Sequence, residues 1–389
     1  MRIGILTLHD SINYGALLQA YALSEVYRSL GHSPVLIDRR RDVAGRALKW
    51  ELSSEPFARR LVWFLGVTGV WHEWLRRRRT LRFLRERIGL TPYCFSDWRN
   101  APADLGVDLI SVGSDQVWNA TIHDPLDYLP GRIPGGVPVI SYAASLGMPC
   151  IPAALAGTFR TAVCGMKAVS VRESSSVLLL AEMGVVARHV VDPVILAGRK
   201  VWERLLVGPV VPSRRIFVYL IGAVDAIAEA ERLNRVADER DVEIDFFVGR
   251  MLVSPWSRRG RLRLLKNLRH WHRCRRSSRF HLHLADGPEE FVRGIAAADA
   301  VITNSYHALL FAVLFGRNVR YVIPEETTPQ AGMMVRIRDY AGDIVRGPLL
   351  QPSAEAAFAS VSAGEKTSVD ADELERRRQE SLEWIKGVL

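Results

Sequence analysis

Short apolar runs alternate with amphipathic stretches along the chain, and this alternation predicts strands and helices in turn. The first apolar run, Arg2 to Leu8, is followed by a polar turn and then by apolar residues three and four positions apart from Ala16 to Leu30, as on one face of a helix. Gly31 ends that helix, and Val35 to Asp38 is the next strand. A strand, a helix and a second strand this close together predict a parallel sheet covered by helices.

The same alternation continues on both sides of a segment rich in glycine and proline, Leu206 to Ser213. We therefore expect an α/β protein with two Rossmann-like, doubly wound domains, residues 1–207 and residues 214–350. A final helix, Ala371 to Val388, falls in a C-terminal segment of residues 371–389, which we expect to pack back on the N-terminal domain. The other predicted strands are Asp108 to Val112, Val139 to Tyr142, Ala168 to Val171, His189 to Val191, Ile216 to Ile221, Glu243 to Val248, Ala300 to Thr303 and Val319 to Ile323. The other predicted helices are Glu73 to Arg87, Ser174 to Met183, Asp225 to Glu239, Pro288 to Ala297 and Tyr306 to Gly316.

Composition agrees with two globular domains. The chain has 389 residues, too many for one ordinary core, and 48% of its positions are hydrophobic. His9 and Asp10 interrupt the first apolar run before it reaches the length of a signal-peptide core, so secretion is not expected. No stretch reaches the roughly 18 uninterrupted apolar residues that a membrane span needs.

Cysteine usage points to a reducing compartment. The four cysteines are Cys94, Cys150, Cys164 and Cys274. They lie far apart and form no C-x-x-C pair, so neither a zinc site nor a disulfide framework is indicated. We therefore expect a cytoplasmic protein.

The formal charge of +10 is unevenly distributed. Arg258 to Arg279 holds ten lysine or arginine residues and no acidic one, and Arg76 to Arg79 is a second basic run. Such runs are either solvated faces or surfaces for an anionic lipid or a phosphorylated acceptor. No zinc-finger or RNA-recognition motif accompanies the charge, so nucleic acid is not expected as a partner.

Polar residues directly after a buried strand are the first positions to consider, because ligands of open parallel sheets bind outside the carboxyl ends of the strands. Asn13, Tyr14 and Gly15 form the first such turn. Gly15 would let a ligand come close, and the following helix offers N–H groups to an anion. An ordinary Asx turn at a helix start explains the same residues.

A second polar turn follows the strand that ends at Val112. Ser114, Asp115 and Gln116 come directly after Gly113, and Asn119 follows within one helical turn. A helix N-cap needs only one such side chain. This turn has more polar side chains than an N-cap needs, which predicts a substrate site.

A third candidate is Arg172, at the end of the strand Ala168 to Val171. Its guanidinium could bind a carboxylate or phosphate of a ligand through two parallel hydrogen bonds. A structural ion pair with Glu173 or Asp192 is the alternative.

The fourth turn consists of Asn304, Ser305, Tyr306 and His307, after the strand Ala300 to Thr303. His307 begins a helix at a strand end, where the helix dipole favours an anion and an imidazole can supply a proton to it. We therefore expect His307 to be catalytic.

Other common enzyme motifs are missing from the sequence. It contains no G-x-x-x-x-G-K-[ST] or G-x-G-x-x-G nucleotide fingerprint, and no G-x-S-x-G or H-E-x-x-H motif of hydrolases.

The polar turns resemble the motifs of the polysaccharide pyruvyl transferase family, in that family's order, from the first strand to about Arg338. The segments that carry the resemblance are Asn13-Tyr14-Gly15, Gln19 to Ala22, Val112 to Asn119, Tyr142 to Ser145, Ser170 to Glu173, Val191-Asp192-Pro193 and Ser305-Tyr306-His307.

The resemblance implies a GT-B-like fold, with the two domains facing each other across a cleft, and the transfer of the enolpyruvyl carbons of phosphoenolpyruvate to sugar hydroxyls as a ketal. It implies that Arg172 and His307 bind the donor's carboxylate and phosphate, with His307 as general acid, and that Asp115 lies near the acceptor or acts as the base. No cofactor and no metal are expected. The other expected substrate-binding residues are Ser305, Asn304, Ser114, Gln116, Asn119, Asn13, Tyr14 and Gly15.

The function expected from the resemblance is a cytoplasmic transferase of cell-envelope or exopolysaccharide assembly. Its acceptor would be a glycan or a lipid-linked sugar, and the two basic runs would face an anionic membrane at its inner surface. One alternative is a GT-B-type glycosyltransferase or sugar-nucleotide enzyme, because fold does not determine reaction. A second is a catalytically silent binding protein, because Asn304 and Ala308 stand where the family often has aspartate and glycine.

Overall fold

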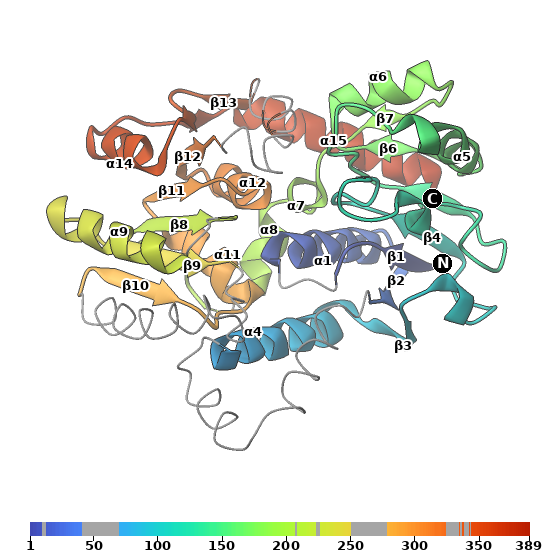
Figure 1. Ribbon diagram of the computed structural model, residues 1–389, viewed down its shortest axis with the longest axis horizontal. Coiled ribbons are helices and arrows are strands. Elements are labelled where there is room, and N and C mark those ends of the chain that lie inside the picture. Colours follow the sequence, from blue (N-terminus) through green and yellow to red (C-terminus); the bar gives the residue numbers. More distant parts are fainter. Residues whose placement is uncertain are drawn as a thin grey trace.

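The computed structural model describes residues 1–9, 13–40, 70–206, 208–222, 226–249, 278–323 and 344–389, with residues 334, 337 and 342. Two parallel sheets, one from each half of the chain, lie at opposite ends of the molecule with helices between them (Figure 1). Both termini lie at the end that holds the first sheet (Figure 1).

The first sheet has the strand order β3-β2-β1-β4-β5. Its central strand β1 pairs with β2 and β4 in parallel, with Ile3 opposite Pro34 and Leu109. Short runs of buried aliphatic residues form these strands, as expected where helices cover both faces of a sheet. The strands are β1 (Arg2–Leu6), β2 (Ser33–Arg39), β3 (Leu90–Phe95), β4 (Leu109–Val112) and β5 (Val139–Ser141), and a small parallel pair, β6 (Ser170–Val171) and β7 (Arg188–His189), continues beside β5.

The second sheet has the strand order β10-β9-β8-β11-β12-β14. Its central strand β8 pairs in parallel with β9 and β11, with Phe217 opposite Asp245 and Val301. The strands are β8 (Ile216–Leu220), β9 (Ile244–Val248), β10 (Phe280–His283), β11 (Ala300–Thr303), β12 (Asn318–Val322) and β14 (Leu350–Gln351), and β13 (Val345–Arg346) forms a separate antiparallel pair with β15 (Ser368–Val369).

Both sheets therefore have the strand order of the Rossmann fold, in which the first strand of each half lies between the second and the fourth. The order reverses between β1 and β4 and between β8 and β11, and these switch points are where such sheets bind ligands. The predicted α/β class with two Rossmann-like, doubly wound units is confirmed.

Helix α1 (Tyr14–Ser29) lies between the two halves and contacts α7, α11 and α12. Every residue from Tyr14 to Ser24 is buried, because side chains from both halves cover the helix. The other helices are α4 (Val70–Phe83), α5 (Ala153–Cys164), α6 (Ser174–Glu182), α7 (Pro193–Leu196), α8 (Arg199–Leu205), α9 (Ala226–Glu239), α11 (Pro288–Ala297), α12 (Tyr306–Leu314), α14 (Ala354–Ser362) and α15 (Ala371–Val388), with short turns η1 (Leu84–Ile88), η2 (Trp98–Asn100) and η3 (Pro125–Tyr128).

The C-terminal helix α15 packs against the first half of the chain. The Ser381 hydroxyl accepts a hydrogen bond from Val191 N at 3.0 Å, and Lys167 Nζ donates to the Val388 carbonyl at 2.7 Å. None of the described helices is long and apolar enough to cross a membrane.

The basic run Arg76 to Arg79 lies in α4, and two of its arginines contact the second half of the chain. Arg76 is 1% exposed and donates from Nη1 to the carbonyls of Val248 and Gly249, at the end of β9, at 2.7 and 2.5 Å. Arg79 donates to the Ala285 carbonyl at 2.9 Å. Arg76 and Arg79 therefore bind the second half of the chain, whereas Arg78 is exposed, and the membrane contact expected for this run stays a prediction. The other basic run lies outside the described residues except for its last two.

Candidate functional site

The turn after β4 is joined to β1 and α1 by hydrogen bonds. Ser114 N donates to Gln19 Oε1 at 3.2 Å, and the Thr7 hydroxyl donates to the Ser114 carbonyl at 2.8 Å. Gly113 has φ +100°, and a Cβ atom there would lie 2.6 Å from the Tyr142 carbonyl oxygen. Glycine is therefore required for the chain to pass beside β5 and to present Ser114 at the switch point.

Arg172, directly after β6, is the central cation of the candidate site. Its Nη1 donates to Asp192 Oδ2 at 3.0 Å, and its guanidinium carbon lies 4.6 Å from the centre of the Tyr306 ring, which belongs to the second half of the chain. Burial disfavours the charged guanidinium, but the neighbouring Tyr306 and three carboxylates outweigh it and hold the pKa of Arg172 above its usual value.

Sequence reasoning placed Asp192 in a family motif, Val191-Asp192-Pro193, and named it as a structural partner of Arg172, but it missed the central place of this residue in the site. It is fully buried between β7 and α7. Oδ1 accepts from Val194 N at 2.9 Å and so caps α7, whereas Oδ2 accepts from Arg172 and, at 3.2 Å, from the Ser114 hydroxyl. The available signals were that motif and the position of Asp192 at the end of the apolar run Val190-Val191.

Two further carboxylates lie beside the guanidinium. Glu173 Oε1 is 3.6 Å from Arg172 Nε, and Asp115 Oδ1 is 3.9 Å from Arg172 Nη2. Glu173 is held by the hydroxyls of Ser145 and Ser176, and Asp115 accepts from Gln116 N at 2.9 Å. Both structural pairs that the sequence left open for Arg172, with Glu173 and with Asp192, are therefore present.

His307 reaches the same place from the second half of the chain. It lies in the first turn of α12, and its Nε2 is 3.8 Å from Asp192 Oδ2. Its ring also lies against Gly15 in the first turn of α1, where a Cβ atom would be 2.2 Å from His307 Nδ1. The carboxyl edges of both sheets thus bring one guanidinium, one imidazole and three carboxylates together.

A family model described as polysaccharide pyruvyl transferase matches residues 13–325, which is most of the chain. The chain belongs to this family. It is accordingly a transferase.

Solved structures with a similar arrangement include UDP-GlcNAc 2-epimerases. The enzyme of Neisseria meningitidis bound to UDP-GlcNAc is 12% identical, with 100% of this chain and 99% of that chain covered and a TM-score of 0.49. The enzyme of Methanocaldococcus jannaschii in complex with UDP-GlcNAc and UDP is 12% identical, with 94% and 92% covered and a TM-score of 0.46. MurG of Acinetobacter baumannii is 12% identical, with 88% and 83% covered and a TM-score of 0.37. No match was found among curated proteins.

In this pyruvyl transferase family member, other predicted site residues make contacts within the fold. Asn304 Oδ1 accepts from Ile221 N at 2.6 Å and its Nδ2 donates to the Ile221 carbonyl at 2.8 Å, so its amide joins the ends of β8 and β11. The Ser305 hydroxyl caps α12, and the Asn13 side chain caps α1. The Tyr14 hydroxyl donates to the Asp286 carbonyl at 2.8 Å.

Gln116 and Asn119 pair with each other rather than with the central cation. Asn119 Nδ2 donates to Gln116 Oε1 at 2.6 Å, and Asn119 Oδ1 accepts from Thr121 N at 2.9 Å. Of the predicted residues, the structure thus gathers Ser114, Asp115 and Gly15 around Arg172 and His307.

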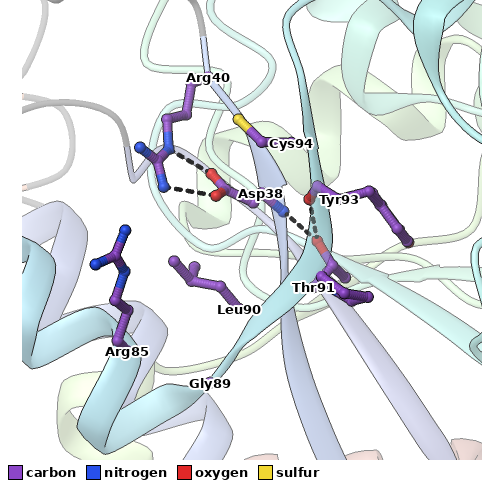
Figure 2. Close-up of a pocket in the computed structure, with 9 residues that line it drawn as sticks. Asp38, Arg40, Arg85, Gly89, Leu90, Thr91, Tyr93 and Cys94 are labelled. Atoms are coloured by element: carbon purple, nitrogen blue, oxygen red, sulfur yellow. Dashed lines mark hydrogen bonds and ion pairs between the residues drawn. The ribbon is translucent and has the colours of Figure 1, made fainter.

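A hollow of about 430 Å³ lies elsewhere on the first half, beside the irregular pairing of β2 and β3. Asp38, Arg40 and Arg85 line this hollow (Figure 2). Nε and Nη2 of Arg40 each donate to Asp38, both at 2.6 Å. Its lining does not include Arg172 or His307.

Proposed function

We propose that this transferase moves the pyruvyl group of phosphoenolpyruvate to a glycan as a ketal of two sugar hydroxyls. The observation that carries the proposal is the meeting of Arg172 and His307 on one carboxylate oxygen, Asp192 Oδ2, at 3.0 and 3.8 Å. A buried guanidinium beside a histidine provides an anion clamp and a proton donor in one place, as an enol phosphate requires.

Arg172 is suited to bind the donor's carboxylate. Two of its nitrogens, Nε and Nη2, are buried and have no hydrogen-bond partner among the described residues. Leaving a buried donor unsatisfied costs about 1–3 kcal/mol, so a ligand that supplies acceptor oxygens gains affinity there. A planar carboxylate matches two adjacent guanidinium donors.

The reaction begins with a proton from His307. It goes to the methylene carbon of phosphoenolpyruvate, which becomes a methyl group, and the adjacent carbon becomes oxocarbenium-like. A sugar hydroxyl adds to that carbon and gives its proton to Asp115. The carbon–oxygen bond to phosphate then breaks, with its electron pair leaving on phosphate.

A second hydroxyl of the same sugar closes the ketal. The second hydroxyl's proton restores His307, and Asp115 passes the first hydroxyl's proton to the released phosphate, so the products are the ketal and inorganic phosphate.

The test measures the transfer of the pyruvyl carbons and the release of phosphate in the same reaction. The purified protein is incubated with phosphoenolpyruvate labelled in its carbons and with a panel of free and lipid-linked glycans, and phosphate release is measured beside label transfer. We expect both in equal amounts with the correct acceptor. We expect Arg172→Lys and His307→Gln to reduce the rate at least about 100-fold.

Arg320→Lys and His32→Gln are the controls, and His32 lies in the turn between α1 and β2. Arg320 is a buried arginine in β12, where it donates to the Ser360 hydroxyl at 2.7 Å, away from the site. Phosphate release without label transfer contradicts the proposal. Saturable binding of a nucleotide sugar with no calorimetric response to phosphoenolpyruvate favours the glycosyltransferase alternative instead.

The acceptor in this proposal is lipid-linked, which rests on the basic run Arg258 to Arg279 in the sequence. Flotation with vesicles of anionic phospholipid at low salt tests it. We expect co-flotation that is lost at high salt. Absence of binding at low salt rejects the membrane part and leaves a free glycan as acceptor.

A further inference from the structure

We infer that Asp192 is a positioning residue that orients two side chains at the same time. These are Arg172, which binds the donor, and His307, which donates the proton. The inference rests on the proposed function, because it assigns Arg172 and His307 their tasks. Asp192 belongs to the first half of the chain, and it joins Arg172 from the same half to His307 from the other.

The two oxygens of Asp192 have separate partners. Oδ1 caps α7 by accepting from Val194 N at 2.9 Å. Oδ2 makes no contribution to that cap and accepts from Arg172 Nη1 and the Ser114 hydroxyl at 3.0 and 3.2 Å. Helix capping therefore explains one oxygen, and the other is directed at the candidate site.

A charged Oδ2 fixes where the guanidinium points. By holding Nη1, it turns Nε and Nη2 of Arg172 toward other acceptors, and these are the two nitrogens that have no hydrogen bond among the described residues. Because Asp192 is fully buried, its charge is little screened by water. The same charge stands 3.8 Å from His307 Nε2, where it stabilises the imidazolium that donates the proton.

Asp192→Asn separates these roles within one side chain. Asparagine is as good an N-cap as aspartate, so Oδ1 can keep its bond to Val194 N. The new NH₂ group then replaces Oδ2 and faces the Arg172 and Ser114 donors, to which it cannot serve as acceptor. Helix α7 therefore keeps its N-cap, whereas Arg172 and His307 lose the carboxylate that they share.

The experiment measures steady-state kinetics of phosphate release and label transfer with phosphoenolpyruvate. We expect Asp192→Asn to raise KM for phosphoenolpyruvate at least about tenfold, through Arg172, and to lower kcat by about 10- to 100-fold, through His307. Asp192→Glu keeps the charge, and we expect it to restore part of kcat.

A double substitution of Asp192 and His307 distinguishes a positioning role of Asp192 from a general loss of structure. In a His307→Gln background, we expect Asp192→Asn to change kcat less than about threefold, because its partner is already missing. The matched control is Asp38→Asn, another buried aspartate bound by an arginine, for which we expect KM and kcat within about twofold of the unsubstituted protein.

A crystal structure of Asp192→Asn gives a readout that needs no turnover. We expect the Arg172 guanidinium to leave the position it has beside residue 192. If Arg172 and His307 stay in place, or if KM and kcat remain within twofold, the inference is overturned. If the unsubstituted protein does not use phosphoenolpyruvate, the proposed function fails, and the crystal structure still decides the role of Asp192.

Discussion

Gly15 and His307, which are 292 positions apart in the sequence, touch across the two halves of the molecule, and a Cβ atom on Gly15 would lie 2.2 Å from Nδ1 of the histidine ring. The sequence predicts that Gly15 lets a ligand come close to the start of α1. The imidazole of His307 fills the space beside Gly15 instead. The missing side chain at Gly15 therefore determines how closely the ring can approach the start of α1.

Gly15→Ala should therefore displace the His307 ring. A misplacement of about 1 Å in a catalytic group costs up to about 100-fold in rate, and we expect a loss of 10- to 100-fold in phosphoenolpyruvate turnover. Crowding of the two helix starts should also lower the free energy of unfolding by about 1–3 kcal/mol. Steady-state kinetics and urea unfolding measure the two effects.

Gly157→Ala is the control for Gly15→Ala. Gly157 lies inside α5, and a Cβ atom there would meet nothing within 4 Å. We expect unchanged kinetics and equal or slightly greater stability. Equal kinetics in both variants would contradict the tight contact at His307.

Asn304→Asp should weaken the second sheet at its switch point. The side-chain amide both accepts from and donates to the backbone of Ile221, at 2.6 and 2.8 Å. An aspartate loses the donor and sets a carboxylate against the Ile221 carbonyl, so we expect a loss of about 1–3 kcal/mol in the free energy of unfolding at pH 7. Urea unfolding checks this, with the exposed Asn100→Asp expected to change it by less than about 0.5 kcal/mol.

Arg76→Ala should weaken the contact between the two halves of the chain. The substitution leaves the Val248 and Gly249 carbonyls at the end of β9 without their donor, and we expect a loss of about 2–4 kcal/mol in the free energy of unfolding. Arg78→Ala, two residues along the same helix, removes an exposed side chain that stacks on Trp74 at 4.6 Å. We expect less than about 1 kcal/mol from it, and similar losses in the two variants would show that Arg76 does not join the halves.

His283 should make stability depend on pH in the alkaline range. Burial opposes its charge, but Asp245 and Asp286, each with an oxygen 3.2 Å from a ring nitrogen, raise the pKa of His283 to about 9. The unfolded pKa is about 6.5, so this stabilisation is complete below pH 6.5 and is lost as the pH rises through 9. We expect a decrease on the order of 2 kcal/mol across that window.

Urea unfolding at several pH values measures the effect. His283→Gln should be less stable at pH 6 and should show a flatter dependence between pH 6.5 and 9. His123→Gln, at a partly buried histidine elsewhere in the first half, should keep the slope of the unsubstituted protein. An equally steep slope in His283→Gln would assign the titration to another group.

Local pattern was sufficient for most of the regular structure. The helix predicted at Ala371 to Val388 has those bounds, and the strands at Ala300 to Thr303 and Glu243 to Val248 are present within one residue. The edge strands β3 and β10 and the helix α5 were not predicted, because partly exposed edge strands and alanine-rich helices show weaker periodicity than central elements.

The sequence by itself determined the alternation of strands and helices and the polar turns that hold Arg172, Ser114 and His307, because these follow from local periodicity and from the ends of parallel strands. The order of the motifs along the chain indicated the family, which the family model confirms. Only the tertiary structure decided which side chains meet. Asp192 became the shared partner of Arg172 and His307, and Arg76 became a buried link, because such contacts join residues that are far apart along the chain. Their distances depend on how the two sheets pack around α1, which no local pattern specifies.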